Sequence, residues 1–283
     1  MRFERYTNVE TFAADTLDIL LENEVQNNLP ISFVKNTSAD TSEWLMSAVK
    51  DAAGSVVIIA ACTPPFNITL YEPGNRPNDE AVNMLSGELR SMGLAVPGVL
   101  AEKRLAWRFA ESYRGSREIH MHMSMNIMRL DAVKEITKAP GHCRLLREDD
   151  LYFAPYWERA FGEDCRVEVY DIQTNVCRLM ERFGKETHVI WENKYPVSQA
   201  VHGRNTQNGA VLGGVYTPPH YLGRGYATSV VAELSQMLLE RGKKFCCLFA
   251  DASNPISCGI YRKIGYGDLC VFDDIRFDTP EIE

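Results

Sequence analysis

The feature that most constrains this chain is a strand-like segment that runs through a glycine turn into a helix-like segment. Residues 209–219, GAVLGGVYTPP, have the apolar character of a strand, and Gly223-Arg224-Gly225 follow them. From Tyr226 onward, apolar residues recur at helical spacing as far as Gly242, a common residue just after a helix end. A strand that leads into a packed helix is the repeating unit of α/β folds.

The segments on either side of this unit continue the alternation of strands and helices. Before it we expect a strand, two helices and a hairpin; after it we expect a strand, a short helix and a last pair of strands that ends at Phe277. The expected ranges are 143–148 for the first strand, 149–161 and 169–183 for the helices, 187–203 for the hairpin and 245–251 for the later strand. This alternation predicts an α/β fold with a mixed, partly parallel twisted sheet flanked by helices.

The first half of the chain is expected to mix the same elements but has no Gly-x-Gly turn. We expect helices at residues 9–24, 42–51, 79–92 and 99–115, an apolar hairpin at 55–73 and a strand at 118–130. The polar stretch at 133–143 contains Pro140-Gly141 and favours a boundary, so we expect domains at residues 1–138 and 139–283. A Thr-Pro-Pro sequence occurs at 63–65 and again at 217–219, which hints at duplication.

Charge and composition disfavour several classes of binding partner. The net charge is −8 and no basic stripe is present, which disfavours nucleic acid and an anionic membrane surface. The N-terminal segment carries acidic residues where a signal peptide needs an apolar core, and no apolar run approaches the ~20 residues that span a bilayer. The eight cysteines form no CxxC pair and are typical of reduced thiols, so we expect a cytoplasmic protein.

Two histidines are candidate metal ligands. His120 and His122 lie on the same face of the strand expected at 118–130. The spacing signals no third ligand, so we expect no metal site.

The Gly-Arg-Gly turn is suited to hold a phosphate. The first N–H groups of a helix lack backbone partners, and the helix start carries about half a positive charge. Gly223 and Gly225 remove side chains that would block a ligand, so residues 222–228 can present a row of N–H donors, with Arg224 as an added cation. The alternative is a tight turn that binds nothing. The turn matches neither the GxxxxGK[ST] loop nor a GxGxxG fingerprint at the start of a domain.

With its flanking strand and helix, the turn resembles the central motif of the GNAT superfamily of N-acetyltransferases, (Gln/Arg)-x-x-Gly-x-(Gly/Ala). Gly225 and Ala227 match its last two defined positions, whereas Leu222 stands where Gln or Arg is usual. Residues 254–266, NPISCGIYRKIGY, resemble a second motif of the superfamily, Asn-x6-Tyr-x-x-x-Gly-(Tyr/Phe). The resemblance covers about residues 141–278. The first half resembles the degenerate partner domain of tandem GNAT proteins, where we expect no cofactor.

The resemblance implies a GNAT-like fold and an N-acetyltransferase that uses acetyl-CoA as cosubstrate. The acceptor is expected to be an amine of a small molecule or peptide, which attacks the thioester directly in a ternary complex. Tyr261 is expected to be the acid that protonates the departing sulfur. The strand carrying residues 215–217 is expected to splay from the strand carrying 249–251, and the pantetheine arm to enter the gap. The expected cofactor-binding residues are Val215, Tyr216, Thr217, Leu222, Gly223, Arg224, Gly225, Tyr226, Ala227, Thr228, Asn254 and Tyr261.

Other roles stay open at the level of sequence. The candidates for the general base are Glu192, His202 and Asp251. Acceptor selectivity is expected to come from the helices after Asp149, where Tyr156, Trp157, Glu158, Glu163 and Asp164 lie. The alternatives to N-acetyl transfer are transfer of a longer acyl group and a catalytically silent CoA-binding module. The first half is also a candidate surface for oligomerisation.

Overall fold

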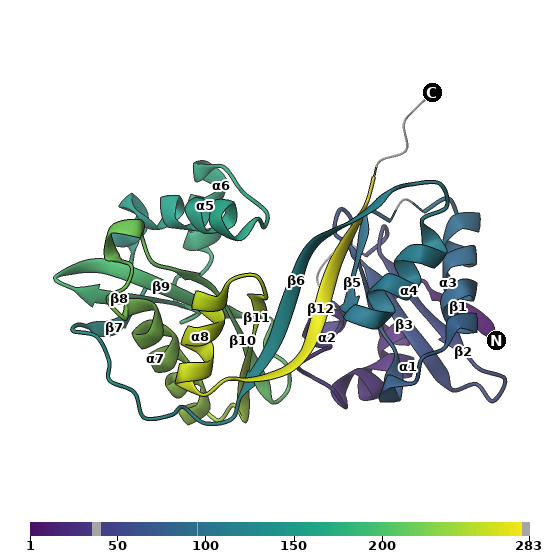
Figure 1. Ribbon diagram of the computed structural model, residues 1–283, viewed down its shortest axis with the longest axis horizontal. Helices are drawn as coiled ribbons and strands as arrows, with labels where there is room; N and C mark the ends of the chain where they lie inside the picture. The colour runs from purple at the N-terminus through teal and green to yellow at the C-terminus, as the bar shows by residue number, and fades with distance from the viewer. Residues whose placement is uncertain (36–40, 95, 279–283) are drawn as a thin grey trace. The chain divides into compact units, whose positions relative to one another are not determined.

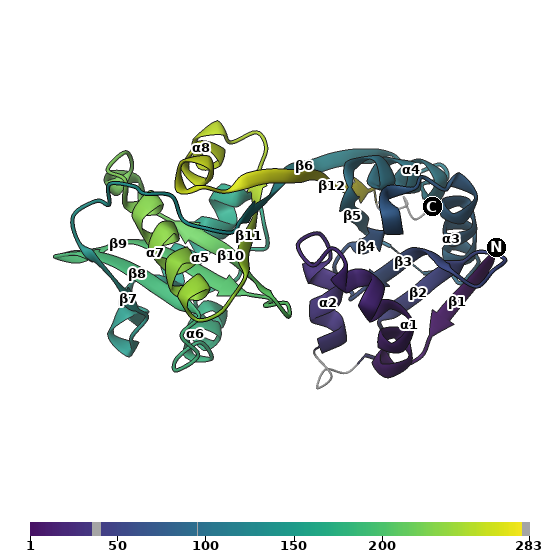
Figure 2. The same ribbon diagram turned by 90° about the horizontal axis from the view of Figure 1, so that it is seen from below.

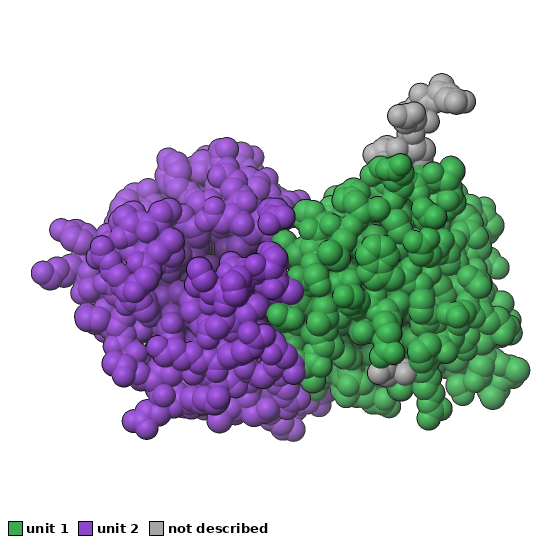
Figure 3. All heavy atoms as spheres, viewed as in Figure 1, with its two compact units in different colours: residues 1–127, 269–283 green, residues 128–268 purple. Residues whose placement is uncertain are grey.

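The computed structural model describes residues 1–35, 41–94 and 96–278 and divides into two compact units (Figure 3). Residues 1–127 and 269–283 form the first unit, and residues 128–268 form the second. This division differs from the boundary expected between residues 138 and 139. It differs because strand β12 (Gly267–Phe277), near the end of the chain, pairs with strand β5 (Gly98–Glu102) of the first unit.

The first unit is a mixed sheet with helices packed on it (Figure 1). Its strands lie in the order β1-β2-β3-β4-β5-β12, in which β4 and β5 are parallel and the other pairs are antiparallel. The remaining elements are β1 (Arg2–Tyr6), α1 (Val9–Leu21), α2 (Asn28–Lys35), β2 (Leu45–Lys50), β3 (Val56–Cys62), β4 (Ile68–Tyr71), α3 (Asp79–Ser91), α4 (Lys103–Tyr113) and β6 (Ile119–Leu130), which continues into the second unit.

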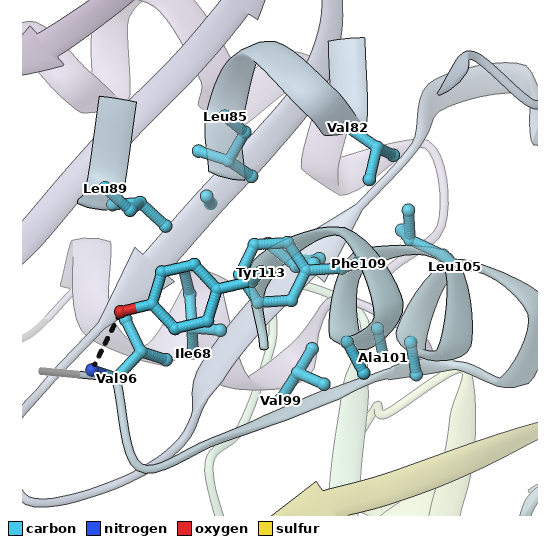
Figure 4. Close-up of a cluster of buried hydrophobic side chains, with 14 of the residues drawn as sticks. Ile68, Val82, Leu85, Leu89, Val96, Val99, Ala101, Leu105, Phe109 and Tyr113 are labelled. Atoms are coloured by element: carbon cyan, nitrogen blue, oxygen red, sulfur yellow. Dashed lines mark hydrogen bonds between the residues drawn. The ribbon is translucent and has the colours of Figure 1, made fainter. Parts of the chain in front are cut away.

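Two apolar clusters hold the first unit together. In one, α3 and α4 pack on the sheet through residues such as Leu85, Leu89 and Phe109 (Figure 4). Tyr113 closes this cluster, because its ring stacks on Phe109 and its hydroxyl donates to the carbonyl of Leu94 at 2.6 Å. In the other cluster, α1 and α2 pack on the sheet. The sheet of the first unit is therefore covered by two separate pairs of helices.

Residues 45–50 form strand β2 and not the helix expected at 42–51. β2 lies between β1 and β3, and its first five residues are buried. A strand buried on both faces shows no polar–apolar alternation, and a short apolar segment of this kind cannot be distinguished from a helix by periodicity. The pairing of β2 with two strands distant in sequence fixes its conformation.

Two further expected elements differ from those in the structure. The helix expected at 99–115 divides into β5 and α4, and Glu102 marks the junction by accepting from the N–H of Arg104 at 3.0 Å. The last pair of strands is one continuous strand, β12. The expected hairpin at 55–73 is confirmed, since β3 and β4 pair antiparallel.

The second unit contains the expected strand–turn–helix segment. Its strands lie in the order β11-β10-β9-β8-β7, and β10 and β11 are parallel, as the alternation of elements predicted. The elements are β7 (His142–Leu145), α5 (Ala154–Cys165), α6 (Ile172–Met180), β8 (His188–Asn193), β9 (Tyr195–Gly203), β10 (Gly209–Tyr216), α7 (Tyr226–Glu240), β11 (Phe245–Asp251) and α8 (Pro255–Ile264).

Helices cover both faces of the second sheet. Figures 1 and 2 show α7 and α8 on one face and α5 and α6 on the other. The face under α7 carries the main core, which includes Leu212, Val230 and Leu248. Within the described ranges, no helix has the length and apolar character needed to cross a bilayer.

Candidate active site

Strands β10 and β11 separate part-way along their length. Their parallel pairing runs from Gly209–Phe245 to Leu212–Leu248 and ends there, although both strands continue. Beyond that point β10 follows β9 instead, where Tyr216 pairs with Gln199. The expected splay between the two strands is therefore present, and it leaves backbone groups of β10 without partners on β11.

A bulge in β10 produces this separation. The register with β9 shifts between Gly213 and Tyr216, so that β10 carries one extra residue. Gly214 lies in the bulge with φ +58°, a left-handed conformation that favours glycine. A Cβ atom at Gly214 would lie 2.9 Å from Cγ2 of Val201, so the position also lacks space for a side chain.

The start of α7 presents unpaired backbone donors. Gly225 is the N-cap in the left-handed conformation, φ +81°, and no side chain caps the helix. The first helical bond is donated by the N–H of Ser229 to the carbonyl of Gly225 at 3.0 Å. The N–H groups of Tyr226, Ala227 and Thr228 therefore have no acceptor within the helix. No acidic residue lies in the first turn, so the positive end of the helix dipole stays uncompensated.

The first unit provides an internal comparison for this helix start. There β4, α3 and β5 form the matching crossover, which again joins two parallel strands. Asn78 caps α3 by accepting from the N–H of Ala81 at 3.0 Å, and Asp79 and Glu80 lie in the first turn. This helix start is filled by its own side chains and carries negative charge. The two crossovers thus share a topology but differ at the position where an anion would bind.

Some side chains of the turn are buried in the core, and others are exposed to solvent. Tyr226 is buried and its hydroxyl accepts from Nδ2 of Asn193 at 2.9 Å, while Thr228 is also buried. Leu222 is 62% exposed, and the guanidinium of Arg224 lies 5.8 Å from the ring centre of Tyr221. Among the expected cofactor-binding residues, Tyr226 and Thr228 therefore offer only backbone groups to a ligand.

Helix α8 begins at the same edge of the sheet as α7. Each helix follows the carboxyl end of one of the two parallel strands, β10 and β11, and such ends share an edge. Asn254 caps α8 by accepting from the N–H of Ser257 at 3.0 Å, and its side chain is exposed. The sequence motif is thereby placed next to the turn motif, because the two strands that carry them are neighbours.

Tyr261 lies on α8 against the core of the second unit. Its ring packs edge-to-face on Tyr266, with 6.0 Å between ring centres. Within the described part of the chain, its hydroxyl makes no hydrogen bond. Burial raises the pKa of the phenol well above its usual value, and the nearby thiols of Cys165 and Cys258 act in the same direction. Tyr261 therefore keeps its proton and has it available for a ligand.

The three candidate bases are each engaged elsewhere. Glu192 accepts from Nε of Arg144 at 2.6 Å, so it is an ion-paired residue of β8. His202 is buried, its Nε2 lies 3.2 Å from the carbonyl of Glu186, and burial lowers its pKa. Asp251 accepts from the N–H and the hydroxyl of Ser253 at 2.8 and 2.7 Å. These contacts give all three residues a structural explanation.

A buried polar network under α5 was not predicted from the sequence. Glu158 of α5 accepts from both terminal nitrogens of Arg182, at 3.2 and 3.3 Å, and from Nε2 of Gln199 at 3.1 Å. Gln199 also donates to the carbonyl of Gly214 in the bulge, and its Oε1 lies 3.2 Å from Nε2 of His188. The network joins α5, β8 and β9 to the bulge in β10. Glu158 was expected only as one of several acidic residues on a helix.

The other residues expected on α5 do not share this position. Trp157 packs 6.0 Å from the ring of Tyr216, and Tyr156 is 58% exposed. Glu163 and Asp164 act with burial to raise the pKa of Tyr216, so they lie near the end of β10. Only Glu158 joins the network at the bulge.

A pocket of about 430 Å³ lies between the helices α5 and α6 and the strands β9 and β10. We call it the α5–β10 pocket. Glu158, His202, Arg204, Gly213 and Gly214 are among its lining residues. Its size is in the range of about 300–1,000 Å³ that is typical of small-molecule sites. The bulge is thus accessible from the face of the sheet opposite α7.

The described residues contain no group of three or more His, Cys, Asp or Glu side chains that could hold a metal ion. His120 lies 3.2 Å from Oδ1 of Asp278, an exposed pair. The second unit combines an uncapped helix start that is suited to an anion, a neutral phenol and a polar pocket.

Comparisons with known proteins agree with this arrangement. A family model described as FR47-like protein matches residues 192–272. No curated protein sequence matches the chain. Among solved structures, a GCN5-related N-acetyltransferase from Sphaerobacter thermophilus is similar with a TM-score of 0.69 at 15% identity, covering 99% of this chain and 97% of that one. A GNAT-family acetyltransferase from Colwellia psychrerythraea has a TM-score of 0.65 at 9% identity, with 98% and 99% covered.

A third structure covers both units. The tandem GNAT protein from the clavulanic acid biosynthesis pathway has a TM-score of 0.60 at 10% identity, with 99% of each chain covered. The chain has the fold of the GNAT superfamily, with the superfamily's two motifs in its second unit. Its fold is similar to that of the tandem GNAT protein along the full length of both chains.

Proposed function

We propose that the second unit transfers an acetyl group from acetyl-CoA to an amine of a small molecule or peptide, by direct attack in a ternary complex. The observation that carries the proposal is the uncapped start of α7 beside the splay of β10 and β11. The matching helix start in the first unit is capped and acidic, which argues that the open start of α7 is a specialised feature.

Two parts of acetyl-CoA, the pyrophosphate and the pantetheine arm, suit different backbone groups at this edge of the sheet. The N–H groups of residues 223–228 and the dipole of α7 suit the pyrophosphate, and Arg224 adds a cation at the same turn. The backbone groups of Val215 and Thr217, which β11 leaves unpaired, suit the amides of the pantetheine arm, as an added strand would. Asn254 lies at the same edge.

Bound acetyl-CoA supplies an activated thioester, so the task of the protein is chiefly alignment. Tyr261 is partly buried and keeps its proton because its pKa is raised, and donation of a hydrogen bond to the departing sulfur suits such a group. Glu158 is paired with Arg182 and keeps its carboxylate beside the bulge, where we propose that it accepts a further hydrogen bond from the acceptor amine in the α5–β10 pocket.

The test is calorimetric titration of acetyl-CoA into the wild type and into Gly225→Glu. A glutamate there adds a side chain and a negative charge at the proposed pyrophosphate site, so we expect loss of binding. The matched control is Gly242→Glu, just after the other end of α7. Gly242 also has a positive φ, +91°, and open space around its Cβ position. We expect Gly242→Glu to bind as the wild type does, and absence of wild-type binding would overturn the proposal.

Turnover separates this proposal from its alternatives. A silent CoA-binding module would bind acetyl-CoA and release no CoA with any amine. An enzyme for longer acyl groups would prefer a longer thioester in the same assay. We also propose that the protein acts in the cytoplasm, without nucleic acid or membrane as a partner. Sedimentation of the purified chain tests whether it self-associates.

A further inference from the structure

We propose that the acceptor carries a carboxylate as well as an amine, and that Arg204 binds this carboxylate in the α5–β10 pocket. The inference rests on the proposed function, since it names the substrate class of the same site. It starts from the charges that line the pocket. Three arginines do so: Arg178, Arg182 and Arg204.

Two of these arginines are already satisfied. Arg182 forms a bidentate ion pair with Glu158. Arg178 lies over the ring of Tyr170, 4.1 Å from its centre, and the hydroxyl of Tyr170 donates to Glu168. Both cations therefore have a fixed role in the wall of the pocket.

Arg204 differs from both. Its guanidinium packs over the ring of Phe249 at 5.4 Å, and within the described ranges no carboxylate lies within 4.0 Å of it. Nearby protein atoms lower the pKa of the guanidinium, and the residue is exposed to solvent and lines the pocket. A guanidinium stays charged under these conditions, and its planar fork of donors matches a carboxylate. A guanidinium without a carboxylate partner is therefore suited to bind one.

The backbone holds Arg204 in place. The residue has φ +46°, an unfavourable conformation for a side chain larger than glycine, and it follows β9 directly. The loop after it is fixed by the buried Thr206, whose N–H donates to the carbonyl of Gly209 at 3.1 Å and whose hydroxyl accepts from the N–H of Gly209 at 3.0 Å. The guanidinium is therefore presented from a fixed loop, as a binding group requires.

Arg204 is separate from the proposed pyrophosphate site. It belongs to the loop that precedes β10, whereas the open start of α7 follows the end of β10. Glu158 lines the same pocket and is linked through Gln199 to the bulge, next to the splay where the pantetheine arm is proposed to lie. The pocket thus offers the Glu158–Arg182 ion pair near the bulge and, elsewhere in its wall, the guanidinium of Arg204, which has no carboxylate partner among the described residues. This pattern is complementary to an amino acid and not to a simple amine.

The experiment compares amines in pairs that differ in one group. Glycine, the longer ω-amino acids and the L-amino acids are each assayed beside their carboxamides, and the release of CoA gives kcat/KM. We expect the best acceptor to be preferred over its carboxamide by about tenfold or more, as for a charge-assisted contact. Arg204→Gln is expected to abolish this preference through KM, whereas Arg204→Lys, which keeps the charge, retains part of it.

The control for the charge change is Arg241→Gln. Arg241 is exposed, pairs with Glu186 at 2.8 Å and is outside the pocket lining, so this variant should keep the preference. Equal use of acid and carboxamide by the wild type, or an unchanged preference in Arg204→Gln, overturns the inference.

A binding measurement separates this inference from the proposed function. The same pairs are titrated calorimetrically into the protein without acetyl-CoA. Carboxylate-dependent binding that Arg204→Gln removes supports the inference even if acetyl-CoA does not bind and the proposed function fails. If acetyl-CoA binds and is turned over but no pair shows a carboxylate preference in binding or turnover, the inference fails alone.

Discussion

The side chain of Gln199 donates a hydrogen bond to the carbonyl of Gly214 at 3.3 Å and so ties β9 to the bulge in β10. The same nitrogen donates to Glu158 at 3.1 Å. One amide therefore connects the backbone distortion that opens the sheet with the acidic group nearest to it. The bulge is held by side chains as well as by glycine.

Replacing Gln199 by glutamate should disturb this connection strongly. Gln199→Glu places a second carboxylate against Glu158 and removes the donor to Gly214, in a fully buried position. We expect a loss of about 2–4 kcal/mol in the free energy of unfolding, measured with urea. The control is Gln236→Glu on α7, a half-exposed residue whose side chain donates to Glu240 one turn away. That variant should lose no more than about 0.5 kcal/mol, and similar losses for both would contradict the role of Gln199.

The two neighbouring glycines of β10 should respond differently to alanine. Gly214→Ala forces a Cβ atom to within 2.9 Å of Val201 at a positive φ, so we expect a loss of about 1–3 kcal/mol and reduced binding of acetyl-CoA. Gly213→Ala meets no atom within 4 Å and has no positive φ, so it should change stability by less than about 0.5 kcal/mol. Urea unfolding and calorimetry measure both effects. Equal behaviour of the two variants would show that the bulge tolerates a side chain.

Removing the hydroxyl of Tyr261 should affect turnover more than binding. We expect Tyr261→Phe to lower kcat by about 10²-fold while the affinity for acetyl-CoA changes little, because the hydroxyl acts on the departing sulfur. Tyr266→Phe is the control, since the hydroxyl of Tyr266 lies 2.8 Å from that of Ser235 in the core. This variant should lose stability and keep its kcat. Equal turnover by Tyr261→Phe and wild type would falsify the assigned role.

The pH profile offers a further check on Tyr261. Since burial raises its pKa, the phenol should stay protonated up to and beyond its usual value of about 10. The wild type should therefore show no decrease in kcat attributable to Tyr261 below about pH 10. A decrease near neutral pH that Tyr261→Phe removes would contradict this.

His188 should make the protein less stable in mild acid. It is buried between Arg182 and Gln199, and burial lowers its pKa to about 4. The unfolded chain binds a proton below about pH 6.5 while the folded chain does not, so stability is lost as the pH falls from about 6.5 toward 4. We expect a loss of about 2 kcal/mol between pH 7 and pH 5, measured by urea unfolding.

A variant isolates the contribution of His188 from that of other groups. His188→Gln cannot titrate and can still contact Gln199. Its stability should depend less on pH over the same interval, even if the variant is less stable at pH 7. An identical pH dependence in variant and wild type would assign the effect to other residues.

The sequence predicted the elements whose signals are local. The α7 segment has a glycine start, an apolar stripe and a glycine end, and the helix at Tyr226–Glu240 fits this prediction. The hairpin of β8 and β9 also turns where expected, between Glu192 and Tyr195. The helix predicted at 42–51 was wrong. Residues 45–50 form strand β2, because only the two neighbouring strands in the sheet determine their conformation.

The residues of the candidate site could likewise be predicted only where the signal is local or follows from the order of elements along the chain. The turn and α8 motifs could be placed on one edge because β10 and β11 are parallel neighbours, and that much follows from chain order. Glu158, Gln199 and Arg182 come from a helix, a strand and the segment after α6, so no spacing along the chain indicates that they meet. The roles of the predicted site residues stay predictions until cosubstrate binding is measured.

Strand β12 has a consequence for how the protein is made. The first unit contains the first 127 residues, yet β5, which pairs with β4 on one side, obtains its second neighbour only from residues 272–276. A ribosome must synthesise the whole second unit before it releases that strand. During translation, β5 is therefore an unprotected sheet edge, which is a template for association with other chains. The first unit, although made first, is the last to be complete.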